Sequence, residues 1–181
     1  MPPQKWKSFG CRTHSPSNMS QIKRFARFFP ATLARIQTGP KVNLRDRTVK
    51  PKGSFDLLTK NDVVEPIPSS QKKFTFPNGC SLRSPTSTTF QDVAEAFNGD
   101  NVKVFIIKEG TPIPDDLVLL YEKTDHFSLQ CSKPMPLTEL NTKITDFLER
   151  HATVMTRKEY QNKFPAGEDN DSLEISSLKD N

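Results

Sequence analysis

The sequence predicts a single α+β domain with a mixed or antiparallel sheet and flanking helices. Strand-like and helical segments follow in the order strands, helix, strands, helix, and neighbouring strands stand close together in the chain. This order favours an α+β fold over a regular β-α-β alternation. A length of 181 residues suffices for one compact domain plus tails. With an apolar share of only 34% but 13 phenylalanines, we expect a phenylalanine-rich core and poorly packed ends.

The two ends of the chain carry opposite charge. Residues 1–45 hold nine Lys or Arg and no acidic residue, whereas residues 166–181 hold five acidic residues against Lys179. We therefore expect a basic leader over 1–28, either disordered or a short amphipathic helix. A folded domain over 29–164 and an acidic, disordered tail over 165–181 should follow.

The basic leader leaves the localisation open. In "MSQIKRFARFF", residues 19–29, apolar side chains recur at helical spacing and basic side chains cover the rest of the surface. This pattern is compatible with a mitochondrial transit peptide, with a disordered leader, or with a first helix that ends at Pro30. An intracellular, cytoplasmic protein is the first expectation and a mitochondrial one the alternative. The start of translation, Met1 or Met19, stays open.

Several classes of protein are not indicated. Cys11, Cys80 and Cys131 are odd in number and never form a C-x-x-C pair, so neither a disulfide framework nor a metal site is predicted. No apolar run approaches the roughly 18 residues of a membrane span. The basic stretch over 31–68 lacks interleaved aromatic residues, so nucleic acid is not an expected partner. Neither nucleotide-binding glycine motif, G-x-G-x-x-G or G-x-x-x-x-G-K-[ST], is present.

The first half of the domain begins with two short strand-like segments, "ATLARIQT" over 31–38 and "SFDLL" over 54–58. "TSTTFQDVAEAF" over 86–97 then predicts a helix. Its apolar stripe consists of Phe90, Val93, Ala94 and Phe97. Ser87 or Thr88 is expected to cap its start, and 98–99, Asn-Gly, to end it.

The second half continues with a strand, "VKVFII" over 102–107, and a proline-stiffened loop, "EGTPIPDD" over 109–116. "LVLLY" over 117–121 is apolar on both faces, which predicts the centre of the sheet. "HFSLQ" over 126–130 predicts the next strand. The last clear element is a helix over 138–151, capped by Thr138, with Arg150 and His151 complementing its C-terminal dipole. We expect the buried face of this helix to consist of Leu140, Ile144, Phe147 and Leu148.

His126 lies on an unusual strand, because side chains alternate between the two faces of a sheet. One face is polar and carries Thr124, His126, Ser128 and Gln130, and the other carries Phe127, Leu129 and Cys131. Beside a central strand, such a polar face must meet water, a cleft or a ligand. The alternative is a solvent-facing edge of the sheet, on which the histidine has no chemical role.

Three segments in a common order carry a resemblance to a known family. They are "FPATLARIQTGPKVNLRDR" over 29–47, "FPNGCSLRSPT" over 76–86 and "VFIIKEGTPIPDDLVLLYEKTDHFSLQCSKPM" over 104–135. Together they resemble the Tse-two family, the type VI secretion toxins with an ADP-ribosyltransferase-like fold, and in particular its fungal branch. The resemblance covers about 29–150 and leaves both tails unexplained.

This resemblance implies a toxin that uses NAD as a substrate and transfers ADP-ribose to a macromolecular acceptor. It implies that Arg35 holds the NAD pyrophosphate and that Ser81 orders the site. His126 and Ser81 would lie at the nicotinamide and its ribose. Phe127 replaces the tyrosine that often follows this histidine, and it is a further candidate contact for NAD. Cys80, beside Ser81, is expected to pack in the core. A cognate inhibitor protein is an expected partner.

One departure from similar transferases bears on catalysis. Many of them carry a glutamate in an E-x-E or Q-x-E motif that binds the ribose hydroxyl and stabilises the developing cation. The strand over 126–130 has no such glutamate, so Gln130 and Glu109 are the remaining catalytic candidates. The alternative function is therefore a non-catalytic binding module that keeps the fold and binds NAD.

Overall fold

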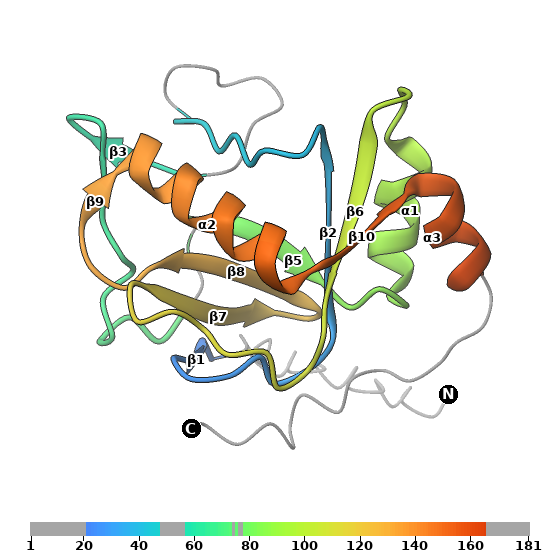
Figure 1. Cartoon of the computed structure of the whole chain (residues 1–181). Helices are drawn as coiled ribbons and strands as arrows, with labels where there is room; N and C mark the ends of the chain where they lie inside the picture. The colour runs from blue at the N-terminus through green and yellow to red at the C-terminus, as the bar shows by residue number, and fades with distance from the viewer. Residues whose placement is uncertain (1–20, 48–56, 74, 76–77, 166–181) are drawn as a thin grey trace, which may run out of the picture.

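The computed structural model describes residues 21–47, 57–73, 75 and 78–165. Within them the chain forms a seven-stranded sheet, a small three-stranded sheet and three helices, so the predicted α+β fold is confirmed. All strand pairs in both sheets are antiparallel. Figure 1 shows α2 lying across the large sheet, while α1 and α3 lie beside its other end.

The elements have the following bounds. The large sheet has the order β1 (Lys23–Phe25), β7 (Leu117–Lys123), β8 (His126–Cys131), β5 (Cys80–Arg83), β2 (Leu33–Thr38), β6 (Val102–Ile107) and β10 (Thr153–Thr156). The small sheet has the order β3 (Thr59–Lys60), β4 (Val63–Val64) and β9 (Met135–Pro136). The helices are α1 (Thr88–Ala96), α2 (Leu137–His151) and α3 (Arg157–Lys163).

The large sheet opens between β2 and β5. These strands pair only at Ala34 and Arg83, whereas β2 pairs with β6 along its whole length and β5 pairs with β8 along its whole length. Figure 1 shows that β2 and β6 cross the direction of β5, β8 and β7 at a steep angle. Among the described residues, this single pair is where the two halves of the sheet meet, and they diverge from it. The divergence creates the space in which the candidate site lies.

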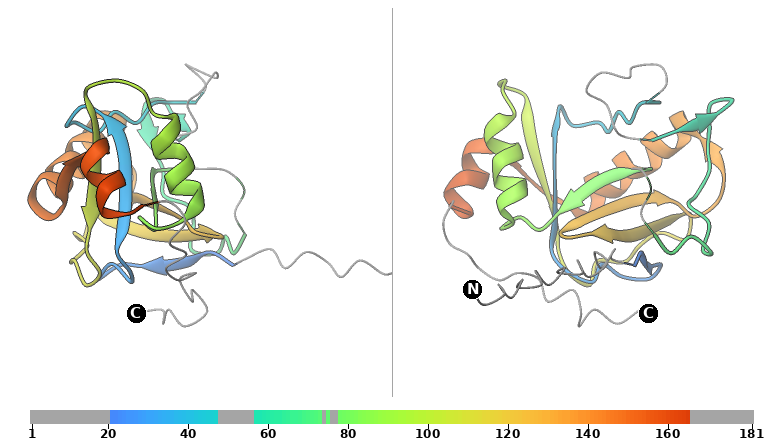
Figure 2. Two further views of the ribbon diagram at one scale, coloured as in Figure 1. Left: turned by 90° about the vertical axis from the view of Figure 1, so that its right-hand side faces the viewer. Right: turned by 180° about the vertical axis from the view of Figure 1, so that it is seen from behind.

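Two hydrophobic cores hold these two halves. The larger core lies between α2 and the sheet, and Phe29 stacks on Phe147 there with ring centroids 5.6 Å apart. The smaller core joins α1 and α3 to β2, β6 and β10, and Phe90 meets Tyr160 edge-on at 5.3 Å. Figure 2 shows α1 and α2 on opposite sides of β2. As expected, phenylalanines occupy both cores.

The segment before residue 29 is a strand and not the helix that its spacing suggests. Lys23–Phe25 forms β1 and pairs with β7, so the helical interpretation is wrong for this part. Pairing covers the backbone of a β7 edge that would otherwise be open, which overrides a weak local helical preference. The Arg24 guanidinium then donates to the carbonyls of Ile67 and Pro68 at 2.6 and 2.7 Å. The rest of the predicted leader, 1–20, lies outside the described residues.

The apolar strand β7 is not the centre of the sheet, because only the short β1 separates it from the edge. It is buried on both faces for another reason. Leu119 faces the large core, while Val118 and Leu120 pack against Ile22 and Ile67. Thr124 was predicted to lie on the same strand as His126, but it does not belong to β8. It lies in the β7–β8 turn with φ 51°, so the strand begins at His126.

The C-terminal part differs most from expectation. Helix α2 buries the four predicted apolar residues, but its N-cap is Pro136 and not Thr138. Beyond α2, the strand β10 and the helix α3 were not predicted, and predicted "SFDLL" lies largely outside the described residues. The sequence does contain a signal for α3. Thr156 and Glu159 form a reciprocal capping box, the T-x-x-E pattern that marks a helix start.

Ser87 is the N-cap of α1, as predicted, and its removal should weaken this helix. Its side-chain oxygen accepts from the Phe90 backbone N–H at 3.2 Å. We expect Ser87→Ala to lower the free energy of unfolding by about 1 kcal/mol, measured by urea denaturation. The matched control is Thr88→Ala at the exposed next position, which should change it by less than about 0.5 kcal/mol. Equal losses in both variants would contradict the capping role.

Candidate active site

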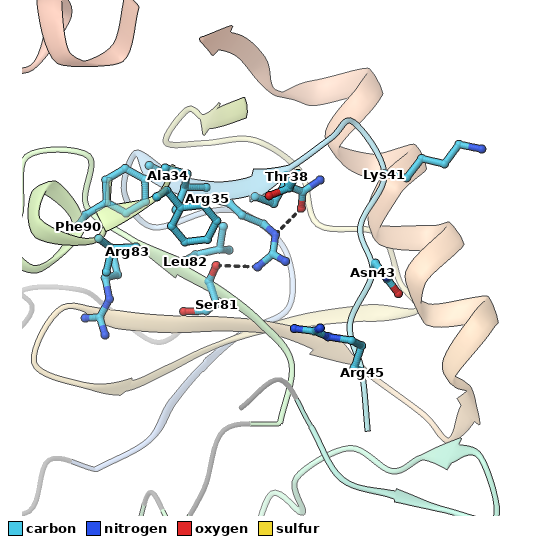
Figure 3. Close-up of a pocket in the computed structure, with 14 residues that line it drawn as sticks. Ala34, Arg35, Thr38, Lys41, Asn43, Arg45, Ser81, Leu82, Arg83 and Phe90 are labelled. Carbon is cyan, nitrogen blue, oxygen red and sulfur yellow. Dashed lines mark hydrogen bonds between the residues drawn. The ribbon is translucent and has the colours of Figure 1, made fainter. Parts of the chain in front are cut away.

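A pocket of about 490 Å³ occupies the opening between β2 and β5. Figure 3 shows its walls: β2 on one side, β5 on another, the segment after β2, and the first turns of α1. The lining residues are Ala34, Arg35, Ile36, Gln37, Thr38, Lys41, Asn43, Arg45, Ser81, Leu82, Arg83, Phe90, Val93 and Phe97. Its volume lies in the range typical of small-molecule sites.

The lining combines positive charge with an aromatic wall. The cations are Arg35, Lys41, Arg45 and Arg83, and among the described residues that line the pocket none is acidic. Arg83 is partly neutralised, because it forms an ion pair with Asp125. The aromatic wall comes from Phe90 of α1 and from Phe97, the residue that caps its C-terminal end. Such a site suits a ligand that carries phosphate groups and a flat ring.

Arg35 is held in place by two hydrogen bonds at the pocket wall. Its Nε donates to Gln37 Oε1 at 2.7 Å, and its Nη1 donates to the Ser81 carbonyl at 3.3 Å (Figure 3). The planar guanidinium is thereby oriented, and this arrangement fits bidentate recognition of phosphate oxygens. Arg35 and Ser81, 46 positions apart in the chain, are brought together at the divergence of the sheet.

Ser81 and His126, two of the candidate site residues, contact each other. Ser81 Oγ lies 2.6 Å from His126 Nε2, and both residues belong to one face of the paired strands β5 and β8. Ser81 is exposed and lines the pocket, whereas His126 is only 7% exposed and lies behind it. All residues of β8 are buried, so the solvent-facing alternative for this strand is wrong.

Glu122 is the member of this cluster that sequence reasoning missed. Its carboxylate is fully buried and lies behind His126, with Oε2 2.9 Å from His126 Nδ1. Its Oε1 accepts from Ser128 Oγ at 2.6 Å and from Gln130 Nε2 at 3.3 Å. One signal in the sequence could have identified it. Side chains alternate along β7, so Glu122 lies on the same face as Val118 and Leu120, and this face of the sheet also carries the polar side chains of β8. A register shift after Tyr121 obscures that alternation.

The other predicted site residues lie apart from the pocket. Gln130 is fully buried beside Glu122, where its Nε2 also donates to Ser128 Oγ at 2.7 Å. Phe127 is fully buried on the opposite face, in the large core with Phe25 and Tyr121, so its position does not support the predicted contact with NAD. Glu109 is exposed in the loop after β6, where its backbone N–H donates to Thr32, and it does not line the pocket.

Neither described cysteine offers a reactive thiol to the pocket. Cys80 is fully buried in the large core beside Ser81, which agrees with the predicted packing role. Cys131 is fully buried as well, and burial raises the pKa of its thiol to about 11. Because the thiolate is the nucleophilic form, this thiol is inert at neutral pH.

The opened sheet, with an arginine on β2 and a serine on β5, agrees with the ADP-ribosyltransferase-like fold that the resemblance implies. A family model described as Tse2 ADP-ribosyltransferase toxin matches residues 31–160, and the chain therefore belongs to this family. The resemblance found in the sequence is confirmed at this level, while the fungal branch and the inhibitor stay predictions. Comparisons with curated proteins and with solved structures found no match. Among the described residues, no helix combines the length and apolar character needed to cross a bilayer.

Proposed function

We propose that the protein is an NAD-dependent ADP-ribosyltransferase toxin that transfers ADP-ribose to a macromolecular acceptor. One observation carries this proposal: Ser81 lies at the pocket wall, with its carbonyl bonded to Arg35 and its hydroxyl bonded to His126. A phosphate-binding cation and a polar group for the ribose are thus held on neighbouring strands. Membership of the Tse2 family supports the same activity.

Each wall of the pocket has a role in this proposal. Arg35 binds the pyrophosphate, with Lys41 adding positive charge from the segment after β2. Phe90 and Phe97 provide an apolar face for the nicotinamide ring. Ser81 contacts the nicotinamide ribose, where positive charge develops as the bond between nicotinamide and ribose breaks. Groups that are already oriented towards that charge lower the barrier without further reorganisation.

A binding module without catalysis is the second candidate function, and a specific observation favours it. The pocket has no carboxylate among its described lining residues, since Glu122 is fully buried behind His126 and Glu109 lies outside the pocket. A carboxylate at the ribose is the usual stabiliser of the developing cation in similar transferases. In this function the protein would keep NAD binding through Arg35 and lack turnover.

Release of nicotinamide from NAD by the full-length protein tests the two functions. We expect release by the wild type, and a loss of about 10²–10³-fold in kcat/KM for both Arg35→Ala and Ser81→Ala, because each removes a group that contacts the substrate. Arg27→Ala, an exposed cation outside the pocket, is the matched control and should retain full activity.

Two other results would decide against the transferase. A folded wild type that binds NAD in calorimetry and releases no nicotinamide, with or without cell lysate as acceptor, would establish the binding module. Equal activity in the wild type and in both pocket variants would place the reaction outside this pocket.

A further inference from the structure

Three polar side chains in contact, Glu122, His126 and Ser81, connect the buried interior to the pocket wall. Glu122 Oε2 lies 2.9 Å from His126 Nδ1, and His126 Nε2 lies 2.6 Å from Ser81 Oγ. Exposure rises along this chain: Glu122 is fully buried, His126 is 7% exposed, and Ser81 is exposed at the pocket. His126 does not line the pocket, so it can act on a bound molecule only through the Ser81 hydroxyl.

The charge state of Glu122 determines where the protons of this cluster lie. Its Oε1 accepts hydrogen bonds from Ser128 and Gln130, and Oε2 is the oxygen that lies beside His126 Nδ1. In the ionised carboxylate, Oε2 is also an acceptor. An accepting Oε2 requires that Nδ1 of His126 carries the proton. In the neutral imidazole, Nε2 is then an acceptor. The Ser81 hydroxyl must therefore donate its proton to His126 Nε2.

This direction determines what Ser81 offers to the pocket. With its proton committed to His126, Oγ presents only lone pairs and can only accept a hydrogen bond from a bound molecule. The same order of acid, histidine and serine activates the serine in catalytic triads on unrelated folds, where the histidine takes the serine proton. Here the serine faces a pocket that is proposed to hold NAD.

We infer that Glu122, His126 and Ser81 form a proton relay that removes the proton of an acceptor with a neutral oxygen, a hydroxyl group or water. The inference rests on the proposed function. As the ribose C1′–N bond breaks, its electron pair leaves with nicotinamide and the acceptor oxygen bonds to C1′. The acceptor proton passes to Ser81 Oγ, and the Ser81 proton passes to His126 Nε2. The imidazolium that results is stabilised by the buried Glu122 carboxylate.

The charge of the site narrows the acceptor to this class. Arginine and amine acceptors are cationic at neutral pH, and Arg35, Lys41 and Arg45 in the pocket lining repel them. A carboxylate acceptor has already lost its proton, and a thiol attacks as the thiolate, which forms far more readily near neutral pH than an alkoxide. Neither acceptor therefore depends on a relay as a hydroxyl group does. A hydroxyl group or water is neutral, donates a hydrogen bond to Ser81 Oγ, and must lose its proton in the reaction.

The tautomer of His126 tests the relay without turnover. The full-length protein labelled with ¹⁵N-histidine contains three histidines, and the His126 signals are assigned by their loss in His126→Asn. We expect neutral His126 to carry its proton on Nδ1 in the wild type. A proton on Nε2, or on both nitrogens, would overturn the relay, because Ser81 would then be the hydrogen-bond acceptor. If His126→Asn does not fold, loss of signals in His14→Asn and in His151→Asn assigns the other two histidines, and the remaining signals belong to His126.

Glu122→Gln tests the relay in the reaction. We expect kcat for nicotinamide release to fall by about 10²–10⁴-fold with the KM for NAD unchanged, because Glu122 acts on proton transfer and not on binding. Glu149→Gln, an exposed position on α2, is the matched control. A wild type with turnover and an equally active Glu122→Gln variant would overturn the relay. A wild type that has the Nδ1 tautomer but no turnover would refute the proposed transferase instead.

The product identifies the acceptor. We expect ADP-ribose either free, when water is the acceptor, or bound to protein or another macromolecule through an oxygen glycoside that resists neutral hydroxylamine and mercuric ion. These two products distinguish water from a hydroxyl group. A linkage cleaved by hydroxylamine indicates a carboxylate or arginine acceptor, and one cleaved by mercuric ion indicates a thiol. Either result would overturn the inferred acceptor class.

Discussion

Replacing Phe147 with alanine is expected to lower the free energy of unfolding by about 3–5 kcal/mol. Phe147 is 1% exposed, stacks on Phe29 at 5.6 Å, and contacts the His151 ring at 5.2 Å. It anchors α2 to the large core, which includes side chains of β5, β7 and β8. Truncation removes its buried apolar surface and leaves a cavity that the surrounding strands cannot fill.

Urea denaturation of the wild type and of Phe147→Ala measures this loss. Phe147→Leu is the matched control, because leucine fills most of the volume, and its cost should stay below about 1.5 kcal/mol. A loss under about 1 kcal/mol for Phe147→Ala would mean that α2 is not anchored through this ring.

Gly79→Ala is expected to impair both stability and activity. Gly79 lies directly before β5, and a Cβ placed on it would come within 2.7 Å of the Leu129 carbonyl oxygen and within 2.7 Å of Gln130 Cγ. Because backbone cannot yield as a flexible side chain does, β5 must shift away from β8. Overpacking of this kind costs about 1–3 kcal/mol. The shift also separates Ser81 from His126, and a displacement of about 1 Å can cost roughly 10²-fold in rate.

Nicotinamide release per folded molecule, combined with urea denaturation, separates these two effects. Gly110→Ala provides the contrast. Gly110 has φ 77° and open space around its Cβ position, and it lies in the loop after β6 outside the pocket. Its replacement should cost about 1–2 kcal/mol through backbone strain and leave the rate unchanged. The interpretation fails if Gly79→Ala retains the full rate, or if Gly110→Ala loses it.

Elements with a strong local pattern were predicted well. The stripe of α1, its Ser87 cap, the strands β2 and β6 and the buried face of α2 all follow from periodicity within the segment itself. Short elements were not predicted from the sequence. Lys23–Phe25 is a strand only because β7 has an edge to pair with, and β10 exists because β6 does. Such pairings are long-range, and a short segment carries little information about them.

The candidate site divides in the same way. Arg35, Ser81 and His126 were identified in the sequence through motifs of a known family, and the structure brings all three together. Glu122 has no motif of its own. Its contact with His126 depends on the β7–β8 register and on the irregularity after Tyr121. The burial of Phe127 on the opposite face depends likewise on how the strand packs.

By itself, the sequence determined the fold class, the family, the amphipathic helices and the residue types available for chemistry. These properties are encoded in local spacing and in short motifs. The tertiary structure decided which polar side chains meet, because the opening between β2 and β5 and the alignment of β5, β7 and β8 arise only when distant strands pair. That pairing alone brings a buried carboxylate within 2.9 Å of a histidine and the histidine within 2.6 Å of a pocket serine.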